Sequence, residues 1–118
     1  MQILYIDSDR AVAQSVMAYM QAHNITVVWA QSAEDALQKL DAHKPECIVL
    51  ELALSGNSGL EFLHESKSYK DWSHIPVILF CQQDVSRHAD ALQKFGVKKV
   101  LYKPRTTLSQ LKKEIERA

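Results

Sequence analysis

Five short apolar runs alternate along the chain with stretches in which hydrophobic residues recur every three or four positions. The runs have the length and the β-branched content of strands, and we predict strands at residues 2–6, 25–29, 47–52, 75–81 and 97–102. The run at 47–52 is apolar apart from Glu51. That pattern is typical of a strand covered on both faces, as strands in parallel sheets are.

Helical spacing fills the intervals between these strands. We predict helices over residues 10–23, from Ser32 to Lys44, in a short stretch after Gly59, over residues 85–95 and from Thr107 onwards. Ser32 and Thr107 each begin a capping-box pattern, which marks a helix start. Asn24 and Gly96 suit the left-handed position that closes a helix.

This alternation of strands and helices predicts a doubly wound α/β fold, in which a parallel sheet with right-handed crossovers carries helices on both faces. A chain of 118 residues with 47% hydrophobic content has the size for one core, so we predict one domain over residues 1–118. In such sheets the functional crevice lies at the carboxyl ends of the strands. The residues that follow each strand are therefore the candidates for function.

Charge and apolar content argue against several classes of protein. The 14 basic and 14 acidic side chains balance, and the pairs Lys98-Lys99 and Lys112-Lys113 fit a solvated basic edge, so we expect no direct nucleic-acid binding. The longest apolar runs fall far short of the ~20 residues that cross a bilayer. The first residues lack the pattern of a secretory signal. We therefore predict a cytoplasmic domain without membrane contact.

Polar or reactive side chains stand at four predicted strand exits: Asp7, Glu51, Cys81 and Lys103. Core packing does not require two carboxylates and an ammonium there, so the pattern indicates a site. Solvated loop residues or a plain structural ion pair are the alternative interpretation. The five histidines and two cysteines lack the spacing of metal ligands, so we expect no zinc centre.

Several stretches of the chain, taken in order, resemble the receiver domain of bacterial two-component response regulators, the CheY-like family. They are residues 3–9 (ILYIDSD), 45–51 (PECIVLE), 59–63 (GLEFL), 75–78 (IPVI) and 103–104 (KP). The resemblance covers essentially the whole chain. It implies the flavodoxin-like fold of that family, with five helices and the strand order 2-1-3-4-5.

The resemblance also implies a mechanism. In the family, a histidine kinase supplies a phosphoryl group to an aspartate at the end of the third strand, with the help of Mg²⁺. Two acids after the first strand hold the metal, while a Ser or Thr after the fourth strand and a lysine after the fifth contact the phosphoryl group. An aromatic residue on the fifth strand then turns inward and changes the face formed by the fourth helix, the fifth strand and the fifth helix.

This chain keeps two of these positions and departs from the family at four. Asp7 matches the first acid and Lys103 matches the lysine. The departures are Ser8 for the second acid, Glu51 for the acceptor aspartate, Cys81 for the hydroxyl residue and Val100 for the aromatic switch residue.

Each departure weakens a phosphate switch. Glu51 is one methylene longer than aspartate, and a misplacement of ~1 Å can cost about a hundredfold in rate. The charges of Asp7, Glu51 and Lys103 sum to −1, whereas the family's set sums to −2, so we expect at most weak Mg²⁺ binding, through Asp7, and no required cofactor. Cys81 is a poorer hydrogen-bond partner than a hydroxyl, and Val100 has no ring to turn. We predict instead a direct ion pair between Glu51 and Lys103 that holds one conformation.

Three hypotheses for function follow. The first is an atypical receiver, or pseudo-receiver, that is not an enzyme and signals by protein binding through the fourth helix, fifth strand and fifth helix. The sequence leaves open a homodimer, a histidine kinase partner, and whether Glu51 mimics the active or the inactive state. The second is a receiver of a longer transcriptional regulator that responds to phosphorylation, or to redox state through Cys81, although buried thiols are usually inert. The third, a nucleotide-binding protein or enzyme on the same fold, is disfavoured because no glycine-rich loop follows the first strand.

Overall fold

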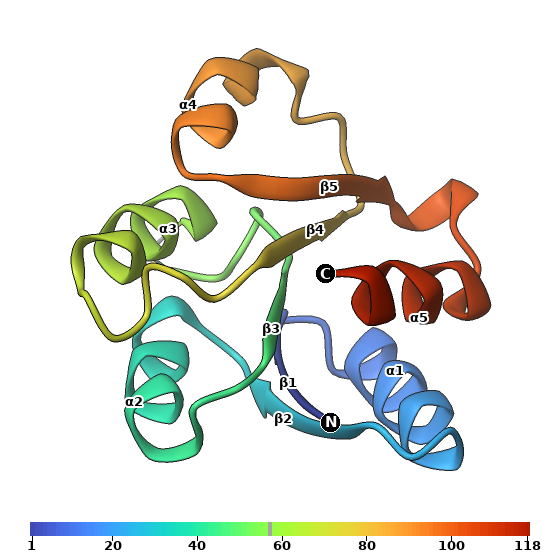
Figure 1. The fold of residues 1–118 in the computed structure, drawn as a ribbon. Helices are drawn as coiled ribbons and strands as arrows, with labels where there is room; N and C mark the ends of the chain where they lie inside the picture. Colours follow the sequence, from blue (N-terminus) through green and yellow to red (C-terminus); the bar gives the residue numbers. More distant parts are fainter. Residues whose placement is uncertain (57) are drawn as a thin grey trace.

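Five parallel strands form one sheet in the order β2-β1-β3-β4-β5 in the computed structural model, which describes residues 1–56 and 58–118 (Figure 1). The strands are β1 (Gln2–Ile6), β2 (Thr26–Ala30), β3 (Cys47–Leu50), β4 (Val77–Cys81) and β5 (Val97–Tyr102). Their order and parallel pairing confirm the predicted doubly wound class. The exits of all five strands consequently meet at one edge of the sheet.

Helices cover both faces of this sheet (Figure 1). Buried residues of α1 (Arg10–Ala22) and α5 (Leu108–Arg117) pack on one face. Those of α2 (Ala33–His43), α3 (Gly59–Ser68) and α4 (Ala89–Lys94) pack on the other. Among the described residues, no helix combines the length and the apolar character needed to cross a membrane.

The alternation of side chains along the central strands divides the core into two clusters. In β1, Ile3 and Tyr5 contact the cluster under α1 and α5, whereas Leu4 and Ile6 contact the cluster under α2 and α3. Every residue of β3 and β4 is buried, as expected for strands covered on both faces. The first polar side chains beyond these strands therefore lie at the border between core and solvent.

Side-chain caps explain where most of the helices begin. Asp9, Ser32, Ser58 and Thr107 each accept a hydrogen bond from a backbone N–H in the first turn of the helix that follows. The predicted capping box at Thr107 is complete, because the Gln110 Oε1 accepts a hydrogen bond from the Thr107 N–H. The one predicted at Ser32 is only half formed, since the Asp35 carboxylate accepts from the Gln31 N–H instead.

Several predicted element bounds are wrong. The second strand is shifted by one residue, the third ends at Leu50, and the fourth begins at Val77 because Pro76 has no N–H for the sheet. The predicted helix over residues 85–95 is divided into a 3₁₀ turn, η1 (Ser86–His88), and the short α4. The N-cap residues of η1 and α4, Val85 and His88, make no side-chain cap bond, whereas the Asp84 carboxylate accepts from the Ser86 N–H at the start of η1.

Candidate functional site

Three charged side chains meet at the carboxyl edge of the sheet. Asp7 follows β1, Glu51 follows β3, and Lys103 begins the 3₁₀ turn η2 (Lys103–Arg105) directly after β5. The Lys103 Nζ lies 2.7 Å from Asp7 Oδ2 and 2.9 Å from Glu51 Oε1. The side chains of Lys103, Asp7 and Glu51 are only 9%, 2% and 5% exposed. The ion pair between Glu51 and Lys103 expected from the sequence is therefore present, and Asp7 is part of it.

Glu51 also accepts backbone hydrogen bonds from two different loops. Its Oε1 accepts from the Gln82 N–H at 2.9 Å, and its Oε2 accepts from the Ala53 N–H at 3.2 Å. Burial opposes ionisation of Glu51, but the bonds from Lys103, Gln82 and Ala53 outweigh it and hold its pKa below the usual value. Lys103 and the two backbone N–H groups thus form a cradle for an anion, and the Glu51 carboxylate fills it.

Lys103 remains charged for the corresponding reason. Burial disfavours its ammonium form, yet the hydrogen bonds to Asp7 and Glu51 outweigh this and raise its pKa. Two carboxylates and one ammonium then carry a net charge of −1 inside a nearly dry site. Such a group is stable only while each charge keeps its partners.

Tyr5 is a site residue that the sequence interpretation missed. Its side chain is completely buried, and its hydroxyl donates to Asp7 Oδ2 at 2.7 Å. Burial, followed by the negative charge of Asp7, raises the pKa of the Tyr5 hydroxyl far above its usual value, so it acts as a neutral donor. A signal was available, because residues two apart on a strand share a face and Tyr5 stands two positions before Asp7.

Ser8, at the position of the family's second acid, serves a structural purpose. Its Oγ donates to the Gln31 carbonyl at 2.8 Å and accepts from the Ser55 N–H at 2.9 Å. It therefore connects the loops that follow β1, β2 and β3. The hydroxyl supplies no negative charge to the crevice.

Cys81 is buried at the end of β4, with its Sγ 3.9 Å from the Leu50 carbonyl oxygen. Burial raises the pKa of its thiol to about 12, and burial raises that of Cys47 equally, to about 12. Both cysteines are free. Because the thiolate is the reactive form, the geometry gives the redox hypothesis no support.

Val100 is half-buried on β5 and packs against the core cluster under α2, α3 and α4. It lines a hollow of about 270 Å³ between β5 and α4, together with Val85, Leu92 and Tyr102. The next aromatic along the strand, Tyr102, donates its hydroxyl to Asp84 at 3.2 Å. The face next to α4 thus presents an apolar hollow at the position of the family's aromatic switch.

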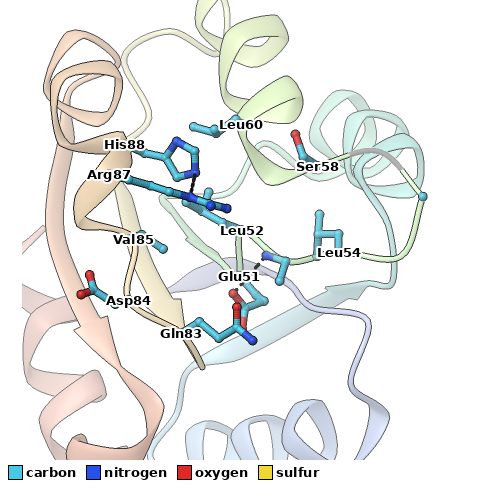
Figure 2. A pocket seen from close by; sticks show the side chains of 12 residues that line it. Glu51, Leu52, Leu54, Ser58, Leu60, Gln83, Asp84, Val85, Arg87 and His88 are labelled. Atoms are coloured by element: carbon cyan, nitrogen blue, oxygen red, sulfur yellow. Dashed lines mark hydrogen bonds between the residues drawn. The ribbon is translucent and has the colours of Figure 1, made fainter.

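A cavity of about 430 Å³ opens beside Glu51 (Figure 2). Leu52 and Leu60 line one part of it and Val85 another. Arg87 and His88 extend over it from η1, and the Arg87 Nε–H donates to His88 Nε2 at 3.1 Å (Figure 2). The crevice is therefore open to small molecules, although the oxygens of Glu51 are already bonded to Lys103 and to backbone N–H groups.

The residues present do not suit the Mg²⁺ that the family resemblance implies. Asp7 Oδ1 accepts from the Asp9 N–H, and Asp7 Oδ2 accepts from Tyr5 and Lys103. The Lys103 ammonium is already a cation in contact with both carboxylates. Over residues 1–56 and 58–118, no group of three or more His, Cys, Asp or Glu side chains is placed to hold a metal. A hard cation that requires several oxygen ligands has too few here.

Comparisons with known proteins agree with the fold described above. A family model described as the response regulator receiver domain matches residues 3–116. The KDP operon transcriptional regulatory protein KdpE of Escherichia coli is 24% identical over 102 residues, 86% of this chain and 44% of that protein. The response regulator MprA of Mycobacterium ulcerans is 26% identical over 127 residues, 99% of this chain and 54% of that protein. The chain thus spans about half the length of these relatives.

Solved structures share the fold. The Vibrio cholerae chemotaxis protein CheY4 superposes with a TM-score of 0.90 at 19% identity, covering 98% of this chain and 96% of that one. The BeF3-activated receiver domain of Klebsiella pneumoniae RstA superposes with a TM-score of 0.87 at 20% identity, covering 99% and 97%. At these identities the likeness concerns the backbone arrangement alone.

Proposed function

Since this chain belongs to the response regulator receiver domain family of two-component signalling, we propose that it is an atypical receiver that signals by binding protein partners without aspartyl phosphorylation. Receiver domains interact with histidine kinases and other proteins. In this proposal the chain catalyses no reaction of its own and needs no metal. The observation that carries the proposal is the Glu51 carboxylate, which fills the cradle made by Lys103 and two backbone N–H groups.

The occupied cradle opposes phosphoryl transfer energetically. A carboxylate oxygen that attacks phosphorus has to turn toward the phosphoryl donor, and hydrogen bonds hold both oxygens of Glu51 in place. Bonds to charged groups contribute about 1.5–3 kcal/mol each, so releasing Glu51 from several of them would add a substantial barrier. A new dianionic group would also enter a site that already carries a net charge of −1.

We propose that the Glu51 carboxylate keeps Lys103 and the surrounding loops in the conformation that a bound anion at this place would stabilise. Lys103 reaches the carboxylate across β4, and the loops after β3 and β4 each contribute an N–H. A phosphoryl group in the family contacts the same lysine. The longer glutamate side chain therefore serves as a permanent internal anion. This favours a receiver held in its active state over one held in its inactive state.

The partner surface in this proposal is formed by α4, β5 and α5. Lys98 and Lys99 on β5 and Lys113 on α5 are exposed, and the apolar hollow beside Val100 lies between β5 and α4. Exposed basic residues and an apolar depression on the same group of elements suit an acidic partner that inserts one hydrophobic side chain. A second copy of the chain is a less suitable partner, because two basic surfaces repel each other.

Phosphoryl analogues test the proposal directly. The protein is exposed to acetyl phosphate with Mg²⁺ and analysed by intact mass, and beryllofluoride with Mg²⁺ is titrated while amide NMR spectra are recorded. We expect no phosphorylated species and no saturable spectral change. A modification of the wild-type protein that disappears in Glu51→Gln would refute the proposal.

A matched variant shows that the assay can detect a working site. The triple substitution Ser8→Asp, Glu51→Asp and Cys81→Thr restores the family's residues at three of the four departures. We expect this variant to give beryllofluoride-dependent changes near Lys103 and in β4. If the triple variant remains silent while keeping a dispersed native spectrum, the three substitutions do not explain the loss of phosphate chemistry.

A further inference from the structure

A second cavity lies at the opposite end of the sheet from Glu51. It has a volume of about 390 Å³ and sits where β4 and β5 begin, between the segment after α3 and the turn that joins α4 to β5. Its charged lining consists of Lys67, Lys94 and Lys98, with His74 beside them. Pro76 and Phe95 supply an apolar wall. Small-molecule pockets commonly have volumes of 300–1,000 Å³, so the space suits a compact ligand.

Lys67 is held in place by the backbone. Its Nζ donates to the carbonyls of Ser73 at 3.1 Å and Ile75 at 2.9 Å. An ammonium has three protons, so one donor of Lys67 remains after these two bonds. Burial, and then the nearby positive charge of Lys98, lower the pKa of Lys67. Lys67 is thus a fixed, half-buried donor beside a second cation.

No acid lines this cavity to balance its lysines. Within the described part of the chain, the salt bridges involve Lys39, Lys103, Lys112 and Arg117, and none involves the three lysines of the cavity. The whole chain has a formal net charge of zero, so an unbalanced group of three is a local excess of positive charge. Like charges held around one space raise the free energy of the empty cavity and favour an anion within it.

We propose that this cavity, termed here the basic cavity, binds a small ligand through a phosphate or diphosphate group. The exposed Lys94 and Lys98 can close on the anion while Lys67 provides a fixed donor. A compact anion with several charges gains more from three lysines that line one space than a monovalent ion does. The inference does not depend on the Glu51 site, which lies at the other edge of the sheet, although Lys94 and Lys98 also belong to α4 and β5 of the proposed partner surface.

Titration with inorganic pyrophosphate at constant ionic strength tests the inference. We expect saturable amide NMR shifts at Ser73, His74 and Gly96, with little change around Glu51. The double variant Lys94→Gln/Lys98→Gln removes two exposed charges that make no ion pair, so its fold should be intact. Charge-assisted hydrogen bonds correspond to about a tenfold effect each, and we expect at least a tenfold loss of affinity in this variant.

The control is Lys113→Gln, which removes an exposed lysine on α5 that does not line the cavity. We expect it to bind pyrophosphate as the wild type does. Equal weakening in the control and the double variant would mean that pyrophosphate responds to overall charge, and it would overturn the inference. So would shifts that never saturate, or shifts that survive in the double variant.

A parallel titration with adenosine diphosphate distinguishes the source of the phosphate group. If the wall of Pro76 and Phe95 contacts a base or sugar, adenosine diphosphate binds more tightly than pyrophosphate and shifts the Phe95 amide. Equal affinities assign the site to the phosphate group alone. Absence of binding by both probes contradicts the inference.

Discussion

Lys103 is the single positive charge between two buried carboxylates, so its removal should cost more than any one hydrogen bond. We predict that Lys103→Met lowers the free energy of unfolding by about 3–5 kcal/mol, the usual cost of leaving a buried charge without its partner. Urea denaturation measures the change. The double variant Lys103→Met/Glu51→Gln should recover part of the loss, and Lys113→Met should be neutral.

Tyr5 contributes a buried hydroxyl to the same group of charges. We predict that Tyr5→Phe, which keeps the ring, lowers the free energy of unfolding by about 1–3 kcal/mol because Asp7 loses a donor at 2.7 Å. Denaturant unfolding of the two proteins provides the comparison. Tyr69→Phe on the exposed surface is the matched control. Equal stability of Tyr5→Phe and the wild type would show that the Tyr5 bond adds nothing.

The acid limb of the stability profile should report on Glu51. Its pKa is lower in the folded protein than the ordinary value of 4.5, so its contribution is present above pH 4.5 and is lost as pH falls through the folded-state pKa. Lys103 shows the opposite sign: its pKa is raised above 10.5, so its contribution is present below that pH and is lost only above it. We predict that Glu51→Gln flattens the decline below pH 4.5, measured as the urea midpoint against pH.

The loss of stability at alkaline pH is less specific to Asp7, Glu51 and Lys103. Burial raises the pKa values of Tyr5, Cys47 and Cys81. The free energy of unfolding therefore also falls as pH rises above the ordinary pKa values of these groups. An unchanged acid limb in Glu51→Gln would therefore be the informative contradiction.

The charged residues of the site could be predicted, but their hydrogen bonds could not. Asp7, Glu51 and Lys103 were found because parallel strands bring their exits to one edge. The donors to Glu51 are backbone groups of Ala53 and Gln82. Their directions depend on loop dihedral angles, and residue type does not reveal these. The periodicity of β1 placed Tyr5 and Asp7 on one face, although a tyrosine in an apolar run usually indicates only core packing.

At the level of elements, α3 approaches the exit of β3 very closely at Gly59. A Cβ atom on this residue would lie 2.7 Å from the Leu52 Cα and 2.9 Å from the Glu51 carbonyl oxygen. The Gly59 N–H also donates to the Leu52 carbonyl at 2.9 Å. The absence of a side chain at the first position of α3 thus sets the spacing between this helix and the loop that carries Glu51.

We predict that Gly59→Ala lowers the free energy of unfolding by about 1–3 kcal/mol, because the backbone next to Glu51 must move. Thermal unfolding measures the loss, and amide NMR shifts at Gln82 and Ala53 report whether Glu51 keeps its bonds. Ser68→Ala, at the exposed end of the same helix, is the control for helix composition. Unaltered stability together with unaltered Gln82 and Ala53 shifts would contradict this prediction.

Strand bounds were predictable to within about two residues because burial on both faces leaves a continuous apolar run. The segment over residues 85–95 was not, since its apolar spacing fits a helix while its N-cap residues make no side-chain cap bond. Tertiary contacts then determine which of these residues form an α-helix. Only Leu92 of α4 is buried, so the core fixes one turn and leaves the preceding residues in 3₁₀ form.

At the scale of the whole molecule, the two ends of the sheet differ in charge. The Glu51 edge holds a net charge of −1 that is already bonded within the protein, and the opposite edge holds the basic cavity. The order of the strands was predictable from the family resemblance and was confirmed. The basic cavity was not, because its three lysines lie on three separate segments that only the folded chain brings together.

We predict that the wild-type melting temperature does not change with MgCl₂ beyond the effect of an equal ionic strength of NaCl. The reason is that Lys103 already neutralises the carboxylates that a metal would need. The triple variant Ser8→Asp/Glu51→Asp/Cys81→Thr should gain thermal stability with MgCl₂. A clear, saturable stabilisation of the wild type by Mg²⁺ would contradict the assignment of Lys103 as the resident cation.

Ser8 joins the carbonyl of Gln31 to the N–H of Ser55, and this contact limits which residues can stand at position 8. An ionised aspartate at position 8 cannot donate to a carbonyl, so Ser8→Asp would lose the bond to Gln31 that ties two loops together. The bridge between these loops and an acid at position 8 therefore exclude each other.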